Sequence, residues 1–382
     1  MKALIITRHY LDENLGGPNC SKAFIRALTA IYKDCTLIYP EHNDRATDMS
    51  FLNSRDVKLV PCFDKRSKVR KCVDMYRGRL HRFGGFVKQF TCNKTYDVVF
   101  IDHSFTASSG ILNTAKNIGK KIVTLHHNVE KDYIKDNKQS ILFRYPYTHY
   151  ALKAEQQSII CSDLNLTLTV SDNQHFSNDY PDKNKSFEVM GMFEYKKNGN
   201  HCHDNISENI FVISGSLASA QTEVAVKLFI NEYLPVLNNI CPDNTLIITG
   251  RNPSESLSSL CSCHKNIRLI PNPEDIFSAI NKGKYYICPL HTGSGIKLRI
   301  MDALSLGLPV IAHKVSVRGY ERIEDNGFMF GYDNISSFED KLKKLINNDF
   351  STDEVANCYI SFFSYEAGEQ RLKSILTKHH LL

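Results

Sequence analysis

The sequence predicts an α/β protein of two doubly wound domains, each built on a parallel sheet. Short β-rich runs alternate with helical patterns along almost the whole chain of 382 residues, which is typical of doubly wound domains. The runs are nearly continuous in apolar residues, as expected for strands that helices cover on both faces. The length exceeds one ordinary core and suits two domains of common size.

Ten runs are predicted to be strands, five in each half of the chain. They are residues 3–7, 35–39, 97–101, 121–125 and 164–170, then 209–214, 245–250, 266–270, 285–289 and 309–313. Residues 191–209 between them are polar and poor in β-branched residues, so we expect a linker there. The predicted domains are therefore 1–195 and 196–365, facing a cleft, followed by a C-terminal helix over 366–382.

Composition and charge limit the class of protein. The chain is 42% hydrophobic and 23% charged, as in folded soluble proteins. Lysines and arginines number 47 against 41 acids, a net charge of +6. This excess suits anionic ligands or a membrane surface but is too small for a dedicated nucleic-acid binder.

Cysteines and hydrophobic runs indicate the compartment. The twelve cysteines are scattered and form no paired CxxC units, so neither a zinc site nor a disulfide framework is expected. The apolar run after Met1 is too short for a signal peptide, and no run of about 18 apolar residues is present. We expect a cytoplasmic protein with reduced thiols.

The segment "HTGSGIKLRIMDALSLGLPVI" (291–311) carries the strongest functional signal. Apolar residues four apart predict a packed helix over 294–306. Gly293 and Gly295 leave backbone N–H groups free before this helix, an arrangement suited to phosphate oxygens. A bound diphosphate would account for the cations Lys297 and Arg299 at the positive end of a helix. Alternatively they lie in water at a cost of at most ~1 kcal/mol each.

Asp302 lies on the same predicted helix. A carboxylate can accept two hydroxyl hydrogen bonds at once, so the 2′ and 3′ hydroxyls of a ribose are natural partners. The alternative is an intrahelical pair with Arg299, in the weaker order of cation before anion.

These motifs resemble those of the GT-B glycosyltransferases of family 4, the group 1 transferases. The run "PLHTGSGIKLRIMDALSLGLPVIA" is similar to the family's nucleotide-sugar signature, and "SGSLASAQTEVAVKLFINEYLP", "LIITGRNP" and "IRLIPNPEDIFSAI" precede it in the family's order. The resemblance is good over 208–320 and looser in the first half. It implies two Rossmann-like domains, with the C-terminal helix crossing back to the first.

The resemblance also implies site residues. The donor diphosphate would contact Lys297 and the backbone of Gly293, Ser294, Gly295 and Ile296, and the ribose would contact Asp302. The family usually has two glutamates eight residues apart, where this chain has Ser294 and Asp302. Because Ser294 cannot act as a carboxylate, the donor sugar stays open.

Further donor contacts are expected after two strands of the second domain. Ser216 could contact phosphate through its hydroxyl and backbone, and Arg251 could offer charge. Either residue could equally belong to a surface loop.

The first domain contributes a glycine loop and histidines. Gly16 and Gly17 would let a loop approach the diphosphate or acceptor, although two glycines more often mark a turn. In "KIVTLHHNVE", the family's functional histidine corresponds to His127 by spelling and to His126 by its place at the strand end. A neutral imidazole can donate to a sugar hydroxyl, or the pair could cap a helix. His103 is a candidate for the acceptor side.

Residues 65–83, "KRSKVRKCVDMYRGRLHRF", combine many cations with apolar residues. The pattern is that of a basic amphipathic helix against anionic lipid, which would serve a lipid-linked acceptor. A solvated basic face is the alternative.

The sequence therefore predicts a glycosyltransferase with catalytic residues His126, His127 and Lys297. It would transfer a sugar from a nucleoside-diphosphate-sugar to a glycan or lipid-linked glycan, at the inner membrane face, in bacterial surface polysaccharide synthesis. The resemblance implies retention of anomeric configuration, and neither metal nor other cofactor is expected. The rivals are a nucleotide-sugar epimerase on the same scaffold, which Ser294 disfavours, and a non-catalytic glycan-binding or scaffold protein.

Overall fold

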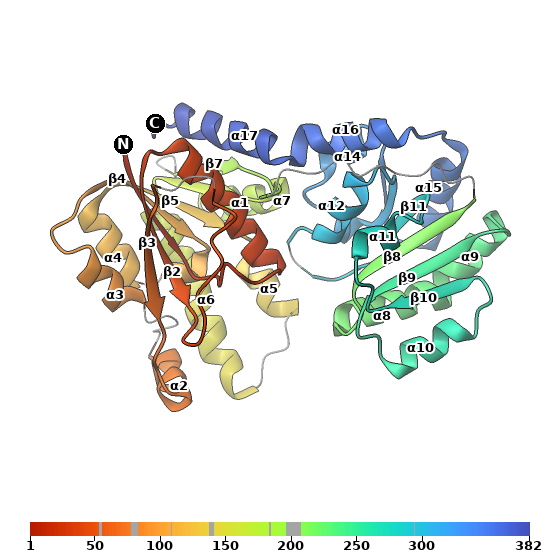
Figure 1. Ribbon diagram of the computed structural model, residues 1–382, viewed down its shortest axis with the longest axis horizontal. Coiled ribbons are helices and arrows are strands. Elements are labelled where there is room, and N and C mark those ends of the chain that lie inside the picture. Colours follow the sequence, from red (N-terminus) through yellow and green to blue (C-terminus); the bar gives the residue numbers. More distant parts are fainter. Residues whose placement is uncertain are drawn as a thin grey trace. The chain divides into compact units, whose positions relative to one another are not determined.

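The computed structural model describes residues 1–52, 56–77, 83–107, 109–136, 141–182, 185–195, 208–293 and 295–382. The chain divides into two compact units. The first is Met1–Lys197 with Ser364–Leu382, and the second is Asn198–Phe363. Each unit contains one parallel sheet with helices around it (Figure 1).

The first sheet has seven strands in the order β3-β2-β1-β4-β5-β6-β7, all paired in parallel. Its strands are β1 (Lys2–Thr7), β2 (Asp34–Glu41), β3 (Lys58–Phe63), β4 (Tyr96–Asp102), β5 (Gly119–His126), β6 (Leu164–Thr167) and β7 (Ser186–Val189). The helices of this unit are α1 (Gly16–Ile31), α2 (Lys68–Tyr76), α3 (Phe83–Phe90), α4 (Ser109–Ile118), α5 (Glu130–Asp136), α6 (Ile141–Cys161), α7 (Val170–Asp179) and α17 (Tyr365–Lys378), with a short turn η1 (Ser104–Thr106).

The second sheet has six parallel strands in the order β10-β9-β8-β11-β12-β13. They are β8 (Ile210–Ser216), β9 (Thr245–Arg251), β10 (Ile267–Pro271), β11 (Tyr285–Cys288), β12 (Val310–His313) and β13 (Met329–Tyr332). The helices are α8 (Ala220–Leu228), η2 (Phe229–Tyr233), α9 (Leu234–Ile240), α10 (Glu255–Ser262), α11 (Ile276–Ile280), α12 (Leu298–Ser305), α13 (Lys314–Val317), α14 (Glu321–Asp325), α15 (Ile335–Asn347) and α16 (Thr352–Phe363).

All ten predicted runs form strands, and the fold class is confirmed. The predicted strand over 164–170 ends at Thr167, because Thr169 caps α7 by accepting a hydrogen bond from the backbone of Asp172. Three strands were not predicted: β3, β7 and β13. Each lies at an edge of its sheet; β3 and β7 are covered incompletely and need no continuous apolar run, whereas β13 is buried but has only four residues, one of them a glycine.

Two separate cores hold the sheets. The first packs the aliphatic residues of β1 and β4, such as Leu4 and Ile101, against α3 and α4. The second is rich in aromatic side chains, where Phe229, Tyr233 and Phe338 pack edge to face and in stacks. Aromatic burial of this kind contributes both area and preferred ring geometry.

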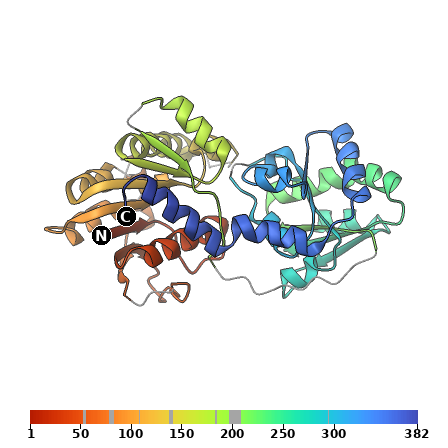
Figure 2. The same cartoon turned by 90° about the horizontal axis from the view of Figure 1, so that it is seen from above.

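The C-terminal helix α17 belongs to the first unit, where it lies along α1 (Figures 1 and 2). The hydroxyl of Tyr32 donates to the carbonyl of Leu381 at 2.5 Å, and Arg371 donates to the carbonyl of Met190. Gly368 packs so closely on the Phe193 ring that a Cβ there would overlap it. These contacts fasten the end of the chain to the first unit.

Within the described residues every cysteine is a free thiol. The same part of the chain contains no helix with both the length and the apolar character that crossing a bilayer requires.

Candidate functional site

Each sheet has one place where the strand order reverses. In the first sheet it lies between β1 and β4, and in the second between β8 and β11. Doubly wound sheets bind ligands beyond the carboxyl ends of their strands at such points, because the two loops leave in opposite directions. Of the predicted site residues, His103 lies in the loop after β4, and Gly293, Gly295, Ile296 and Lys297 lie in the loop after β11.

In the second unit the glycine-rich turn is longer than predicted and its helix shorter. Gly293 and Gly295 have φ values of +97° and +73°, a left-handed conformation that favours glycine. Lys297 is extended and caps α12, which begins at Leu298 instead of residue 294. Ile296 is half-buried in the turn, and Ser294 lies outside the described residues.

The ammonium group of Lys297 is turned back onto this loop. Its Nζ donates to the carbonyls of Gly293 at 2.9 Å and Gly295 at 3.2 Å, and the residue is only 9% exposed. Gln221 donates from Nε2 to the carbonyl of Thr292 at 2.5 Å, which joins the start of α8 to the loop after β11. A cation and a turn of left-handed glycines are thus held together at the reversal point of the second sheet.

Arg299 does not pair with Asp302, so the intrahelical alternative is wrong. Its guanidinium donates to the carbonyl of Ser214 at 3.0 Å and the hydroxyl of Thr222 at 3.2 Å. The group occupies the space that a side chain at Gly215 would need. Arg299 therefore fastens α12 to β8 and α8.

Asp302 is a half-buried residue of α12, the helix that follows this turn. Burial raises its pKa to about 6, although the charge of Arg299 acts in the opposite direction. Among the described residues, none hydrogen-bonds or pairs with its carboxylate oxygens. A half-buried carboxylate that no described residue uses can accept hydrogen bonds from the hydroxyls of a ligand.

Ser216 and Arg251 are register partners at the last positions of β8 and β9. Both are exposed. The structure thus brings them together at the carboxyl edge of the second sheet, near the β8 loop.

In the first unit three imidazoles meet beyond the ends of β1, β4 and β5. The ring centres of His9, His103 and His127 lie 4.9 to 5.4 Å apart. Burial, together with the neighbouring His127, lowers the pKa of His9 to about 3. His103 has an unusual backbone φ of +75°, and non-glycine outliers of this kind cluster at functional sites.

Asp102 organises this cluster from the last position of β4. Its Oδ1 lies 2.7 Å from Nε2 of His127, and its Oδ2 accepts from the Thr7 hydroxyl at 2.6 Å. Burial alone would raise the pKa of Asp102, but the charge and hydrogen bond of His127 lower it to about 2. Because an ionised carboxylate only accepts, Nε2 of His127 carries a proton, and in the neutral ring Nδ1 is then an acceptor.

His126 faces away from the cluster. Its Nε2 lies 3.0 Å from Oδ1 of Asn165, and its ring packs on Phe176. Successive residues of a strand point to opposite faces, and His126 is fully buried with its pKa lowered by burial to about 4. The geometry thus separates the two histidines and puts His127 with the polar cluster.

The three clustered imidazoles are the group in the described chain whose spacing suits a metal ion, with nitrogens within 4.8 Å of one another. However, Nδ1 of His103 accepts the backbone N–H of Phe105 at 3.1 Å. The neutral ring then carries its proton on Nε2 and offers no lone pair there. The residues present therefore do not fit a metal in this arrangement.

Gly16 and Gly17 are the first two residues of α1 and not part of the preceding loop, which corrects the sequence expectation. A Cβ at Gly17 would lie 2.4 Å from Cε1 of His9. The glycine therefore makes room for this ring, whose Nδ1 lies 3.1 Å from the hydroxyl of Ser21.

Residues 208–348 match the family described as Glycosyl transferases group 1. This chain carries a glycosyl transferases group 1 domain. No curated protein sequence matches the chain. The match and the two parallel-sheet units together support a glycosyltransferase of the GT-B fold.

Solved structures share this scaffold over the whole chain. Sucrose-phosphate synthase from Thermosynechococcus elongatus is 11% identical with a TM-score of 0.69, covering 100% of this chain and 99% of that one. The lipopolysaccharide outer core galactosyltransferase WaaB, in its apo form, is 10% identical with a TM-score of 0.64 and 99% coverage of both chains. Anabaena HepE in complex with UDP and glucose is 11% identical with a TM-score of 0.63, covering 98% and 99%.

Four residues of the glycosyltransferase's first unit were not identified from the sequence: Arg8, His9, Asp102 and Glu130. Ser104 donates to Oε1 of Glu130 at 2.5 Å, and burial raises the pKa of Glu130 to about 8. Three of the four lie at or within two positions of the end of β1 or β4. These three residues could have been found by comparing the residues that follow each predicted strand, since the ends of neighbouring parallel strands lie together.

A pocket of about 540 Å³ lies beside the imidazole cluster. We call it the aromatic pocket; its walls include Arg8, His9, Phe105, Tyr147, Lys71 and Met75. The Arg8 guanidinium lies 4.8 Å from the centre of the Phe105 ring. The pocket thus combines aromatic surface with positive charge.

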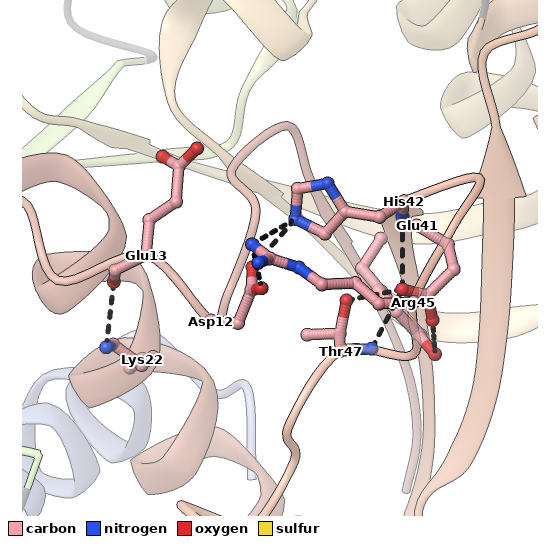
Figure 3. A network of polar contacts seen from close by, with 8 residues as sticks. Asp12, Glu13, Lys22, Glu41, His42, Arg45 and Thr47 are labelled. Carbon is pink, nitrogen blue, oxygen red and sulfur yellow. Dashed lines mark hydrogen bonds and ion pairs between the residues drawn. The ribbon is translucent and has the colours of Figure 1, made fainter.

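Polar contacts brace the loop that follows β1 (Figure 3). Asp12 pairs with His42 at 3.0 Å and Arg45 at 2.7 Å, and Lys22 donates to the carbonyl of Glu13 at 3.0 Å. Tyr10, which lines the aromatic pocket, stacks on the His42 ring at 4.2 Å. The loops after β1 and β2 are therefore held together beside the pocket.

Proposed function

We propose that this glycosyltransferase transfers a hexosyl group from a nucleoside-diphosphate-sugar to a hydroxyl of a glycan or lipid-linked glycan. The second unit would bind the donor and the first unit the acceptor. The observation that carries the proposal is the glycine turn before α12, where the Lys297 ammonium is held against two left-handed glycines and the half-buried carboxylate of Asp302 lies on the helix that follows.

In this proposal the donor's diphosphate binds the N–H groups of the turn and the ammonium of Lys297. Negative charge develops on the leaving diphosphate as the glycosidic bond breaks, so a fixed cation there stabilises the transition state. Asp302 accepts the hydroxyl hydrogen bonds of the ribose. Ser216 and Arg251, at the adjoining strand ends, are further donor contacts.

The acceptor would bind in the aromatic pocket, next to His127. With its proton held on Nε2 by Asp102, His127 offers Nδ1 to a sugar hydroxyl. The proposal includes retention of configuration, with an oxygen of the leaving phosphate taking the acceptor proton. It also includes a role in bacterial surface polysaccharide synthesis at the inner membrane face. WaaB, a lipopolysaccharide galactosyltransferase by name, has the same scaffold.

Thermal unfolding with UDP, GDP, CMP and ADP sugars tests the donor site. A ligand at 100 times its Kd stabilises the folded state by about 2.7 kcal/mol, so the true donor should raise the Tm well above the others. Lys297→Met should abolish the shift, whereas Lys314→Met, an exposed lysine paired with Asp333, should keep it. A chain that responds to no sugar nucleotide, or a Lys297→Met variant with a full shift, contradicts the proposal.

A further inference from the structure

Helix α2 buries a charged residue and exposes apolar ones, the reverse of the usual arrangement. Its one buried residue is Asp74, whereas Val69, Val73 and Tyr76 are 74%, 38% and 52% exposed. Their spacing of four and three places them on one stripe of the helix. Helices on protein surfaces normally bury such a stripe, whereas here Val69 and Val73 are exposed in the part of the chain that the structure describes. Figure 1 shows α2 at the end of the first unit to which β3 leads.

Ion pairs explain why the helix holds this orientation. Arg66 lies 2.9 Å from Asp64 and 3.2 Å from Asp74, and its side chain is only 8% exposed. Arg70 pairs with the same Asp74 at 3.1 Å. Tyr150 of α6 also donates to the carbonyl of Tyr76 at 2.9 Å. Because these ion pairs hold Asp74 on the inner side of the helix, Val69 and Val73 face outward.

The exposed stripe is surrounded by positive charge. Residues 64–77 contain six lysines and arginines against two aspartates, a net charge of +4. Both aspartates are used by the buried pairs. Within the described residues, Lys65, Lys68 and Arg77 form no ion pair, and all three are exposed. Residues 78–82 of the basic segment identified from the sequence lie outside the described residues.

We propose that α2 docks on an anionic lipid bilayer, with the stripe of Val69, Val73 and Tyr76 in the interface and the cations on lipid headgroups. Apolar side chains ringed by lysine and arginine are what such a surface binds. The other side of α2 contributes Lys71 and Met75 to the aromatic pocket. Docking would therefore bring this pocket to the bilayer. The use of the pocket for an acceptor in the bilayer rests on the proposed function, whereas the docking itself does not.

Cosedimentation with vesicles tests the docking. The full chain should bind vesicles of phosphatidylcholine with phosphatidylglycerol and not those of phosphatidylcholine alone, and 0.5 M NaCl should weaken binding. Val69→Ser with Val73→Ser, and separately Lys65→Gln with Lys68→Gln and Arg77→Gln, should each lower the partition coefficient about 10-fold or more. Equal binding to both vesicles, or variants that bind like the parent, would overturn the proposal.

Matched controls remove the same chemistry from the second unit. Val224→Ser replaces a valine that is 56% exposed, and Lys265→Gln with Arg268→Gln and Lys344→Gln removes three exposed charges. These controls should bind vesicles like the parent. The α2 variants should keep the parent's Tm and its donor-induced shift. Vesicle binding without any donor shift would reject the proposed function while leaving the docking intact.

Discussion

The carboxylate of Asp102 and the imidazole of His127 form a buried pair, 2.7 Å apart, where the central strands of the first sheet end. The pair fixes the tautomer of His127. Asp102→Asn would offer an amide that can donate to Nε2, which favours the other tautomer. We expect turnover of the sugar nucleotide to fall by about 100-fold or more, as for loss of a positioned acid–base group, with little change in donor affinity.

Asp97→Asn is the matched control, since Asp97 lies at the opposite end of β4 and accepts from the backbone of Lys2. It should leave turnover near the parental value. An Asp102→Asn variant that is as active as this control would remove His127 from the chemistry.

Asp302 predicts how nucleotide affinity depends on pH. Its pKa of about 6 means that the carboxylate becomes protonated, and loses acceptor capacity, as the pH falls from 7.5 to 5. The Kd of the donor nucleotide should therefore rise over this range in the parent. Asp302→Asn should bind about 10-fold more weakly at pH 7.5, since a hydrogen bond to a charged group contributes about 1.5–3 kcal/mol.

Isothermal titration calorimetry at both pH values makes this measurement. The Kd at pH 5 divided by the Kd at pH 7.5 should be larger for the parent than for Asp302→Asn. Identical ratios would place the ribose elsewhere.

Glu130 predicts a pH dependence of stability. Its folded pKa of about 8 lies above its usual value of 4.5, so the folded state holds a proton that the unfolded state releases. This contribution is complete below pH 4.5 and is lost as the pH rises towards 8. Relative to Glu130→Gln, the parent should lose about 2–5 kcal/mol of unfolding free energy between pH 5 and 8.5.

Urea unfolding of both proteins at the two pH values checks this difference, and groups common to both proteins cancel. Glu232→Gln, at an exposed position of the second unit, should track the parent. A constant difference between parent and Glu130→Gln would show that this carboxyl is ionised throughout.

Gly215 predicts a steric effect. A Cβ there would lie 2.4 Å from Nη1 of Arg299, and its φ is +140°. Gly215→Ala should therefore lower the Tm by several degrees, because the anchored guanidinium must move. At Gly327 φ is +79° and nothing lies within 4 Å of the added Cβ, so Gly327→Ala reports backbone strain alone. Differential scanning fluorimetry should give a clearly larger loss for Gly215→Ala than for Gly327→Ala.

The central strands could be predicted because helices cover both their faces, which demands an unbroken apolar run. Edge strands such as β3 tolerate polar residues and even Pro61, so the same rule missed them. The start of α12 was misplaced because left-handed glycines delay the helix, while the apolar spacing continues across the turn.

The site was predictable only in part. The turn at Lys297 and the motif HNVE stand out in the sequence because their residues are contiguous. The link between Asp102 and His127 joins residues from β4 and the end of β5, and no local pattern encodes it. Strand alternation requires His126 and His127 to face opposite ways, but only the packing of Phe176 and Asn165 decides which ring enters the core.

Because α17 covers α1, the first unit is complete only after residues on both sides of the second unit have been synthesised. During synthesis the surface of α1 and Tyr32 stays uncovered until the segment from Ser364 onward has been made. The second unit can finish folding in that interval. Removing the segment from Ser364 onward would therefore leave this surface of the amino-terminal half without its cover.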